Sequence, residues 1–481
     1  MNRLLFGRCF ISVKENLCYT FTKMRIYNTL TRKIEEFKPL NPLKVGLYTC
    51  GPTVYGPGHL GHARTYVNFD LLKRTLFYNG FKVKHILNIT DVHDDMIKKA
   101  NELGITIFEL SDKYMALFLQ DMKDLNTIAA DHYPKVTEHI KEIIEMVKAL
   151  VDKDFAYVEK DGSVYFRVAK FKGYGQLSGI KLEKAKTGTR VETDKYEKES
   201  VADFVLWKGA KKGEPSWDSP WGKGRPGWHI ECSVMSKKYL GNTIDIHGGA
   251  TDLKFPHHEN EIAQSEAANG ALFVKYWFHP GLLDIESQKM SKSLGNYIEI
   301  HEIKEKGFDP LALRYLFLTT HYRQKLNFTW KSLEAAQSAL KNLRLQIINY
   351  QLSIINSRRS SLSQDKLEKI EDFQKRFVDF INDDLAIPQA LALVWEVVKS
   401  NIPPGDKLDL ILDFDQIFGL KLSEVKKEKI KIPIEVKKLV EEREKMRREK
   451  KWDEADKIRK RVEKLGFNLN DVAKETVIYP K

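Results

Sequence analysis

The chain has 481 residues, 42% of them hydrophobic and 30% charged, and its 79 basic and 66 acidic side chains give a net charge of +13. This length suffices for about three domains with a large buried core, which excludes a peptide or a small disulfide-stapled fold. No stretch approaches the roughly 20 apolar residues of a membrane-spanning helix, so we expect no membrane span. The basic surplus favours a polyanionic partner such as RNA, with an acidic lipid surface as the weaker alternative.

Residues 1–23 carry four basic side chains and one acidic one. This composition resembles an organellar transit peptide, but the segment is short and lacks a clean cleavage pattern, and Met24 is an alternative start. We therefore treat residues 1–23 as an N-terminal extension and expect a cytoplasmic protein, with an organellar one as the alternative. The chain has only four cysteines, of which two lie in the extension, so no disulfide framework is expected.

Residues 44–50 form an apolar run that predicts a buried strand ending at Gly51 and Pro52. A loop rich in glycine follows, and a helix is expected to begin near His62. Further along, residues 71–78 predict a helix and residues 82–89 predict a second strand. The alternation of strand, glycine-rich loop and helix predicts an α/β fold with a doubly wound parallel sheet, whose ligands bind at the carboxyl ends of the strands.

An insertion is expected at about residues 110–200, where helices surround a predicted hairpin over residues 156–167 with Asp-Gly at its turn. Short strands at 244–246 and 282–283 then indicate that the sheet is completed after the insertion. We therefore expect a split Rossmann-like domain over residues 24–300.

Strands are expected to disappear beyond residue 310, where apolar residues recur every three or four positions, as in packed amphipathic helices. One such stripe consists of Leu333, Ala336, Leu340, Leu343 and Ile347, and a second of Leu367, Ile370, Phe373 and Phe377. We expect an all-α bundle over residues 301–420 and a basic helical tail over 421–481, whose last helix ends near Gly466. The tail holds 20 basic and 13 acidic residues. A solvated helical hairpin and an RNA-contacting surface are both open interpretations of this charge.

The sequence His59-Leu60-Gly61-His62 lies where the first loop enters its helix. Free backbone N–H groups and the helix dipole favour phosphate at such a position. The two imidazoles can donate hydrogen bonds to a phosphate as its charge grows, and Gly61 permits close approach of a nucleotide. A chance pair of histidines is the alternative interpretation.

The second motif is Lys289-Met290-Ser291-Lys292-Ser293, which places two lysines and two hydroxyls in one loop. Such a loop is suited to hold a reacting phosphate and the departing pyrophosphate. An exposed basic loop without function is the alternative.

Four dispersed residues could form a metal site. Cys50 ends the first strand, Cys232 lies far along the chain, and His257 and Glu261 are four apart on one helical face. Two thiolates, an imidazole and a carboxylate are a ligand set for Zn²⁺. Since no local CxxC pair supports the site, two buried thiols are the alternative.

Taken together, the two loop motifs resemble the signatures of class I aminoacyl-tRNA synthetases. The longer strings at residues 48–55, 227–233 and 245–261 resemble those of the cysteinyl-tRNA synthetase family, and the resemblance runs from Met24 to the C-terminus. It implies activation of L-cysteine with ATP and Mg²⁺, followed by esterification of tRNA(Cys). It also implies anticodon binding in the bundle of residues 301–420. We expect a monomer rather than a homodimer.

The resemblance also assigns roles to residues. One Zn²⁺ per chain would be held by Cys50, Cys232, His257 and Glu261, and would accept the substrate thiolate as a further ligand. Asp252 would hold the substrate ammonium, and the pocket would be shaped by Thr53, Trp228 and His247. His229 and His258 are expected to support the ligands or to pack. ATP would contact Gly51, His59, Gly61, His62, Lys289, Ser291 and Lys292, with both histidines and both lysines catalytic.

Two positions depart from the family pattern, since His93 stands where an acid is expected and Asp95 where a lysine is expected. The role of both positions stays open. Residues 383–388 also differ from the usual pattern and are expected to pack.

Two alternative functions are weighed against this interpretation. A related ligase that joins cysteine to an amino sugar resembles the catalytic half but needs no anticodon-reading end. A non-catalytic RNA-binding relative is expected to have lost the phosphate-handling histidines and lysines, which this chain keeps.

Overall fold

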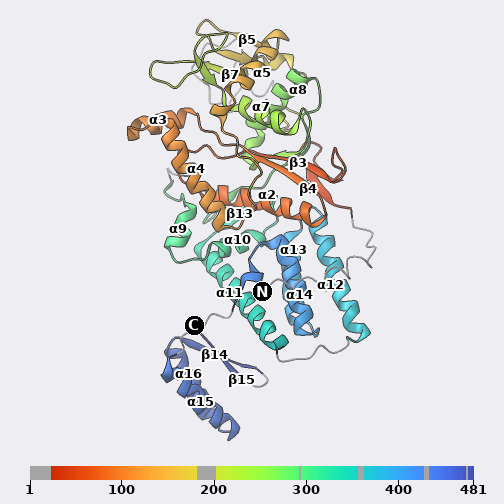
Figure 1. Cartoon of the computed structure of the whole chain (residues 1–481), viewed down its shortest axis with the longest axis vertical. Coiled ribbons are helices and arrows are strands. Elements are labelled where there is room, and N and C mark those ends of the chain that lie inside the picture. The colour runs from red at the N-terminus through yellow and green to blue at the C-terminus, as the bar shows by residue number, and fades with distance from the viewer. Residues whose placement is uncertain are drawn as a thin grey trace, which may run out of the picture. The chain divides into compact units, whose positions relative to one another are not determined.

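The computed structural model describes residues 23–180, 202–291, 294–355, 362–426, 433–472 and 475–480. The chain divides into two compact units, Met1–Ser423 and Glu424–Lys481, whose elements are labelled in Figure 1. Among the described residues, every helix is too short or too polar to cross a lipid bilayer.

Four parallel strands form the central sheet of the first unit, in the spatial order β10, β9, β3, β4. Their bounds are Lys44–Thr49 for β3, Lys82–Leu87 for β4, Ile244–Gly248 for β9 and Val274–Phe278 for β10. All five residues of β9 and the last three of β3 are buried, as expected of strands covered on both faces. The sequence predicted β3, β4 and β9, whereas the fourth strand is β10 and not the predicted strand at residues 282–283.

The strands are added to the sheet in opposite directions from its centre, so the strand order reverses between β3 and β9. Helix α2 (Leu60–Tyr78) leads from β3 to β4, whereas α8 (His257–Asn269) leads from β9 to β10 on the other side. Helix α7 (Trp228–Leu240) also packs on the sheet, and Figure 1 shows α2 and α7 on opposite faces. The sheet is therefore doubly wound, and the space beyond the adjacent ends of β3 and β9 is the expected place for ligands.

A second, antiparallel sheet lies within the insertion. It contains β5 (Ala156–Val158), β6 (Val164–Phe166), β7 (Phe204–Gly209) and β8 (Gly224–Pro226) in that order. The pairing of β5 with β6 confirms the predicted hairpin. This sheet continues to Pro226, past the boundary of about 200 expected for the insertion, because β7 pairs with β6 rather than with the parallel sheet. The accompanying helices are α3 (Asp94–Leu103), α4 (Ile107–Asp124) and α5 (Ile140–Asp152).

Two small sheets flank the central one. Strands β1 (Arg25–Asn28) and β2 (Lys33–Glu36) form a hairpin, and β11 (Leu283–Ile285) pairs with both β12 (Gln288–Lys289) and β13 (Leu326–Phe328). The prediction that strands disappear beyond residue 310 is therefore wrong at β13, which is too short to show a period. Short 3₁₀ helices are η1 (Val136–Glu138), η2 (Val168–Lys170), η3 (Thr251–Lys254) and η5 (Leu422–Glu424).

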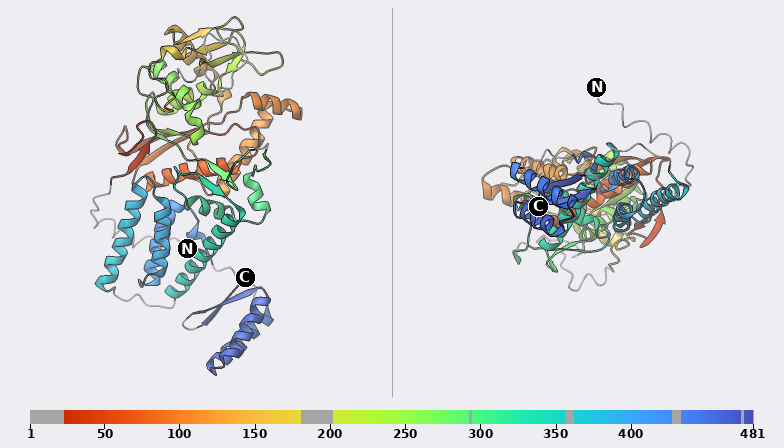
Figure 2. Two further views of the ribbon diagram at one scale, coloured as in Figure 1. Left: turned by 180° about the vertical axis from the view of Figure 1, so that it is seen from behind. Right: turned by 90° about the horizontal axis from the view of Figure 1, so that it is seen from below.

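The rest of the first unit is helical. Its helices are α9 (Ile300–Glu305), α10 (Pro310–Leu318), α11 (Trp330–Ile355), α12 (Gln364–Asn382), α13 (Ile387–Lys399) and α14 (Pro404–Phe418). The last four lie side by side in Figures 1 and 2. All five residues of the first predicted stripe are buried on α11, whereas in the second stripe only Phe373 and Phe377 are buried. In the segment 383–388, Asp384 accepts hydrogen bonds from the Tyr27 amide and the Tyr322 hydroxyl, which supports the expected packing role.

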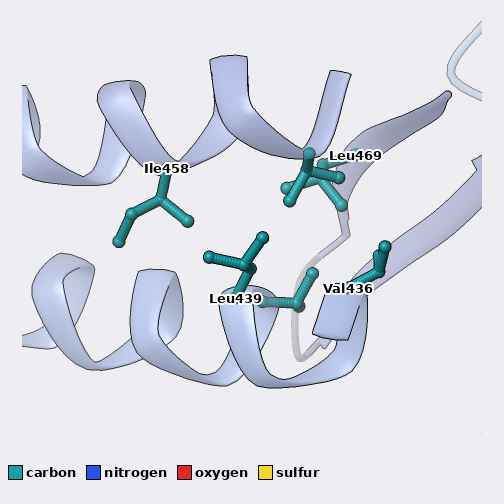
Figure 3. Packing of buried hydrophobic residues seen from close by; sticks show 6 residues of the cluster. Val436, Leu439, Ile458 and Leu469 are labelled. Carbon is teal, nitrogen blue, oxygen red and sulfur yellow. The ribbon is translucent and has the colours of Figure 1, made fainter. Parts of the chain in front are cut away.

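The second unit contains α15 (Ile434–Arg448), α16 (Trp452–Lys464) and the hairpin of β14 (Phe467–Val472) and β15 (Glu475–Pro480). Its apolar core consists of Val436, Leu439, Val440, Ile458, Val462 and Leu469, and Figure 3 draws six residues of this cluster. Gly466 follows Leu465, the C-cap of α16, and has a φ of 83°, as predicted for the residue that ends this helix. The sequence predicted the two helices but not the hairpin.

Candidate functional site

The first half of the site is the start of helix α2. His59 is its N-cap, and the Nδ1 atom of its ring accepts hydrogen bonds from the amides of Gly61 at 3.0 Å and His62 at 3.3 Å. The His62 ring returns the contact, because its Nδ1 accepts from the His59 amide at 3.4 Å. A Cβ at Gly61 would lie 2.8 Å from the His59 ring, so a larger residue would displace this cap.

These hydrogen bonds fix the tautomers of both histidines. Since each Nδ1 is an acceptor, each neutral ring carries its hydrogen on Nε2. The two rings stack with centroids 3.7 Å apart, and burial lowers the pKa of His62 to about 4. At neutral pH His62 is therefore an uncharged ring with one N–H left to donate to a ligand.

The residues around the second motif lie directly beside this helix start. The Leu60 amide donates to the Ile298 carbonyl at 3.1 Å, and the Ile300 amide donates to the Gly58 carbonyl at 2.9 Å. The Tyr297 ring meets the edge of the His59 ring at 5.2 Å. A Cβ at Gly61 would also lie 3.4 Å from Met290. The two predicted loops are therefore neighbours in space.

Asn296 closes the loop of the second motif. Its side chain accepts from the Ser291 amide at 2.8 Å and donates to the Lys289 carbonyl at 3.1 Å. Lys289 itself is exposed at the end of β12. Lys292 lies outside the described residues.

The second half of the site is a buried group of metal-ligating side chains at the ends of β3 and β9. Cys50 follows β3, and its amide donates to the Gly248 carbonyl, at the end of β9, at 3.0 Å. Cys232 comes from α7, and His257 and Glu261 lie one turn apart on α8. All four side chains are at most 6% exposed. The structure therefore brings together the four residues predicted as metal ligands.

The distances suit one ion. The sulfurs of Cys50 and Cys232 are 3.8 Å apart, Cys50 Sγ is 3.8 Å from Glu261 Oε1, and His257 Nε2 is 3.0 Å from the same oxygen. Zinc–ligand bonds of about 2.0 to 2.3 Å place the donor atoms of a tetrahedral site roughly 3.3 to 3.8 Å apart. The two distances from Cys50 lie at the upper end of this range, whereas the distance between His257 and Glu261 is shorter, as in a direct hydrogen bond between the two side chains. Thiolate sulfur, imidazole nitrogen and carboxylate oxygen are all common ligands of zinc, so the residues present fit this metal.

The pKa values in this group favour negatively charged side chains that can bind a cation. Burial opposes ionisation of Glu261, but His247 and His257 lower its pKa to about 2. Burial also opposes a thiolate at Cys232, but hydrogen bonding with Cys50 and the proximity of His257 lower the pKa of Cys232 to about 6. Burial and the neighbouring Cys232 raise the pKa of Cys50 well above its usual value. These shifts favour an ionised carboxylate at Glu261 and a thiolate at Cys232.

Further histidines surround this group. One of them, His258, lies among the donor atoms, although the sequence indicated only a supporting or packing role for it. His258 Nε2 lies 3.3 Å from Cys50 Sγ, and the donor atoms of Cys50, His257, His258 and Glu261 all lie within 4.8 Å of one another. His258 Nδ1 lies 2.8 Å from His279 Nε2, and His229 Nδ1 lies 2.9 Å from His257 Nδ1. No local spacing pointed to His258 over His257, because the two are adjacent.

The predicted substrate-pocket residues fall into different environments. The Trp228 ring lies 4.4 Å from the His257 ring, so this indole covers the metal-ligating group. His247 is fully buried, with Nδ1 2.9 Å from the Tyr48 carbonyl and Nε2 2.8 Å from Glu261 Oε2. Thr53 forms an isolated parallel β-bridge with Thr90, and Asp252 is exposed on η3. The structure thus places Trp228 and His247 against the donor group.

The loop that carries Gly51 and Thr53 is held by residues that the sequence analysis did not single out. The Gly51 amide donates to Asn88 Oδ1 at 2.9 Å, and a Cβ at Gly51 would lie 1.5 Å from the Asn88 carbonyl. The Thr90 hydroxyl donates to the buried Glu231 carboxylate at 2.9 Å. Glu231 precedes Cys232, but nothing in its spacing predicts this contact.

The two departures from the family pattern lie at the start of α3. His93 caps this helix, because its Nδ1 accepts from the Asp95 amide at 3.3 Å. Its ring also meets that of Trp228 at 6.1 Å. Asp94, between the two, pairs with Lys208 of the inserted sheet at 2.7 Å. The segment therefore ties α3 to the insertion.

Comparisons with known proteins agree with this geometry. A family model described as the class I (C) tRNA synthetase catalytic domain matches residues 36–338, and one described as the cysteinyl-tRNA ligase anticodon binding domain matches residues 431–476. The cysteine–tRNA ligase of Thermococcus gammatolerans is 46% identical over 471 residues, which cover 94% of this chain and 98% of that protein. The enzyme of the same name from Thermococcus onnurineus is 44% identical over 473 residues, with the same coverage of both chains.

Solved structures share the fold at low identity. Methionyl-tRNA synthetase of Mycobacterium tuberculosis aligns with a TM-score of 0.56 at 13% identity, over 78% of this chain and 90% of that one. The LeuRS of an Agrobacterium radiobacter LeuRS–tRNA complex aligns with a TM-score of 0.57 at 11% identity, over 81% of this chain and 85% of that one. The fold and the paired signature loops define a class I aminoacyl-tRNA synthetase. Within this class, the chain belongs to the cysteinyl-tRNA synthetase family.

Proposed function

We propose that this chain is a cysteine–tRNA ligase whose metal site selects the thiol of L-cysteine. In the first step a carboxylate oxygen of cysteine bonds to the α-phosphorus of ATP, and the bond to the β-phosphate oxygen breaks to release pyrophosphate. In the second step a hydroxyl of the terminal adenosine of tRNA(Cys) attacks the cysteinyl carbonyl, and AMP leaves. The observation that carries this proposal is the convergence of Cys50, Cys232, His257 and Glu261 beside the His59 loop.

We assign these four residues as the ligands of one Zn²⁺. The bound metal would supply an electrophilic site that prefers the soft sulfur of cysteine to the hydroxyl of serine. His257 faces Glu261 with Nε2, so its Nδ1–H is free to donate to His229 and to fix the ring orientation. His258 is better suited to donate to the Cys50 sulfur, because His279 lies within hydrogen-bonding distance of its other nitrogen.

Phosphate handling is assigned to the start of α2 and the neighbouring loop. The neutral Nε2–H groups of His59 and His62 would donate to the α-phosphate as its charge increases during transfer. Lys289 and Lys292, with Ser291, would neutralise the β- and γ-phosphates together with Mg²⁺. Trp228 and Thr53 would line the amino-acid pocket, and Asp252 would bind the substrate ammonium.

Recognition of tRNA is assigned to the second unit. The matched anticodon-binding model covers residues 431–476, which lie in this unit and outside the bundle of residues 301–420 where anticodon binding was expected. A ligase acting on an amino sugar would need no such domain, so this match favours the tRNA-dependent function. The net positive charge of the last residues supports contact with the phosphate backbone. Monomeric state and cytoplasmic location remain predictions.

A paired measurement tests the proposal. Purified protein should contain about one zinc per chain by elemental analysis and should catalyse ATP–pyrophosphate exchange with cysteine. The kcat/KM for cysteine should exceed that for serine by about 10⁴ or more, because a site that demands one ligating group rejects its analogue strongly. Exchange with serine at a comparable rate, or full activity in zinc-free protein, would remove the role assigned to the metal.

A further inference from the structure

Arg64 is a charged residue buried in the core of the first unit. It lies on α2, two positions after His62, and it is only 1% exposed. Its Nη1 donates to the Gly281 carbonyl at 2.9 Å and to the Leu282 carbonyl, and its Nη2 donates to the Gln324 carbonyl. A buried charge costs free energy unless other groups compensate it. Here the dipoles of three main-chain carbonyls face the guanidinium.

The three carbonyls belong to the beginnings of two neighbouring strands. Gly281 and Leu282 directly precede β11, and Gln324 lies two residues before β13. The two segments are tightly packed, because a Cβ at Gly281 would lie 2.6 Å from the Gln324 carbonyl oxygen. Arginine suits this place, since its planar group presents several N–H donors in fixed directions. The guanidinium therefore joins both backbone segments to α2 at one end of the small sheet.

The same small sheet carries the second motif. Strand β11 pairs with β12, whose last residue is Lys289. Further along the chain, the Ile298 carbonyl accepts a hydrogen bond from the Leu60 amide at 3.1 Å. The segment that contains the second motif is therefore attached to α2 at both ends, through Arg64 before the motif and through Leu60 after it.

Arg64 and His62 serve different sides of α2. Residues two apart on an α-helix are separated by about 200° around its axis. The guanidinium of Arg64 is directed at the backbone carbonyls of the small sheet, whereas the His62 ring stacks on the His59 ring. Burial lowers the pKa of Arg64 to about 10, so the guanidinium stays charged at neutral pH. Any effect of Arg64 on the reaction must therefore act through the small sheet.

We propose that Arg64 is a positioning residue that sets the place of the Lys289 loop relative to the start of α2. The inference rests on the phosphate-handling roles proposed above for the two signature loops. In that function His59 and His62 act on the α-phosphate while Lys289 acts on the departing pyrophosphate, so both loops must keep one geometry during transfer. A displacement of about 1 Å can lower the rate of such a reaction by about 10²-fold.

Arg64→Lys tests this role. The ammonium keeps a positive charge among the carbonyls, but one nitrogen cannot replace the two-sided bridge of the guanidinium. In cysteine-dependent ATP–pyrophosphate exchange by the full-length protein, kcat should fall by about 10²-fold. The KM for cysteine should change by less than about twofold, because the displaced loop acts on the transition state and not on the binding of the amino acid.

Arg314→Lys is the matched control. Arg314 lies on α10, is fully buried and donates to the carbonyls of Leu125 and Phe418. Its Nη2 also pairs with Asp70 of α2 at 2.6 Å. These contacts join α2 to the helical bundle and not to the small sheet. The control should therefore lose stability but keep the wild-type kcat, with thermal unfolding used to choose a temperature at which both variants are folded.

Hydrogen–deuterium exchange of the wild type tests the attachment without any variant. The Leu326 amide donates to the Leu282 carbonyl at 3.1 Å, beside the guanidinium. Peptides covering residues 281–285 and 325–328 should therefore be protected as strongly as those of α2, because local protection follows the stability of the local structure. In Arg64→Lys these two peptides should lose protection, whereas in Arg314→Lys they should keep it.

The expected result is a loss of kcat and of local protection in Arg64→Lys alone. A wild-type kcat in folded Arg64→Lys, or weak protection of residues 281–285 in the wild type, would overturn the inference and leave the proposed function intact. An equal loss of kcat in Arg314→Lys would also overturn it, because the effect would then follow general destabilisation. A wild-type protein without cysteine-dependent pyrophosphate exchange would refute the proposed function itself, so the two failures are distinguishable.

Discussion

One substitution should separate the observed role of His59 as a helix cap from its proposed role as a donor to the phosphate. Its Nδ1 caps helix α2 by accepting from the amides of Gly61 and His62, and its Nε2–H is the proposed donor to the phosphate. In His59→Asn, the side-chain oxygen takes the place of Nδ1, because asparagine is among the best N-cap residues. We expect stability to change by less than about 0.5 kcal/mol. Loss of the donor should lower the rate of adenylate formation by about 10² to 10³, or about 2.7 to 4 kcal/mol in activation free energy.

The matched variant is His59→Ala, which loses both functions. It should show the same catalytic defect together with a loss of about 1 kcal/mol in stability, the usual cost of removing an N-cap. Single-turnover formation of cysteinyl adenylate measures the first effect, and urea unfolding measures the second. If His59→Asn retains wild-type rates, His59 is only a cap and the proposed phosphate contact is wrong.

Three further predictions concern the metal, pH and the second unit. Cys232→Ser should lose most of its bound zinc, whereas His258→Asn should retain it, since only Cys232 is a proposed ligand. Zinc content is measured by elemental analysis, and the opposite pattern would make His258 the ligand and Cys232 a supporting residue. Burial lowers the pKa of His85 to about 3 from 6.5, so the unfolded chain takes up its proton first and stability is lost as pH falls below about 6.5. Between pH 7 and pH 5 this amounts to about 2 kcal/mol, and unfolding of His85→Gln should lack that part of the pH dependence; equal slopes would contradict it. A chain ending at Ser423 should keep cysteine-dependent pyrophosphate exchange but have a higher KM for tRNA, and an unchanged KM at physiological salt would exclude RNA contact by the second unit.

Local signals in the sequence predicted the parts of the site that depend on local geometry. The strand before Cys50 and the helix start at His59 follow from an apolar run and a glycine-rich loop. The spacing of His257 and Glu261 places both on one helical face, as the structure confirms. By contrast, the packing of Met290 against Gly61 depends on residues more than 200 positions apart, and no periodicity encodes such a distance.

The missed elements have physical reasons of their own. Strand β10 is a short apolar run next to a helix, and such runs do not reveal whether they are strand or helix. The hairpin of β14 and β15 begins directly after Gly466 and covers the core of the second unit, so it is fixed by packing rather than by alternation. His258 could not be distinguished from its neighbour His257, because the choice depends on which ring faces Cys50.

The segment that follows β3 contributes to both halves of the site and, in the proposed function, links amino-acid selection to chemistry. Cys50 directly follows β3, and the loop after it leads to His59, so one segment of backbone positions one of the proposed metal ligands and one of the proposed phosphate donors. The Gly51 amide bound to Asn88 keeps this segment from shifting. In the proposed function, a substrate that engages the metal through its side chain would be held at a set distance from the phosphate. An amino acid without that contact loses orientation as well as affinity, and orientation alone contributes several kcal/mol to such reactions. Selection against serine is thus expected to act on the rate of adenylate formation and not only on binding.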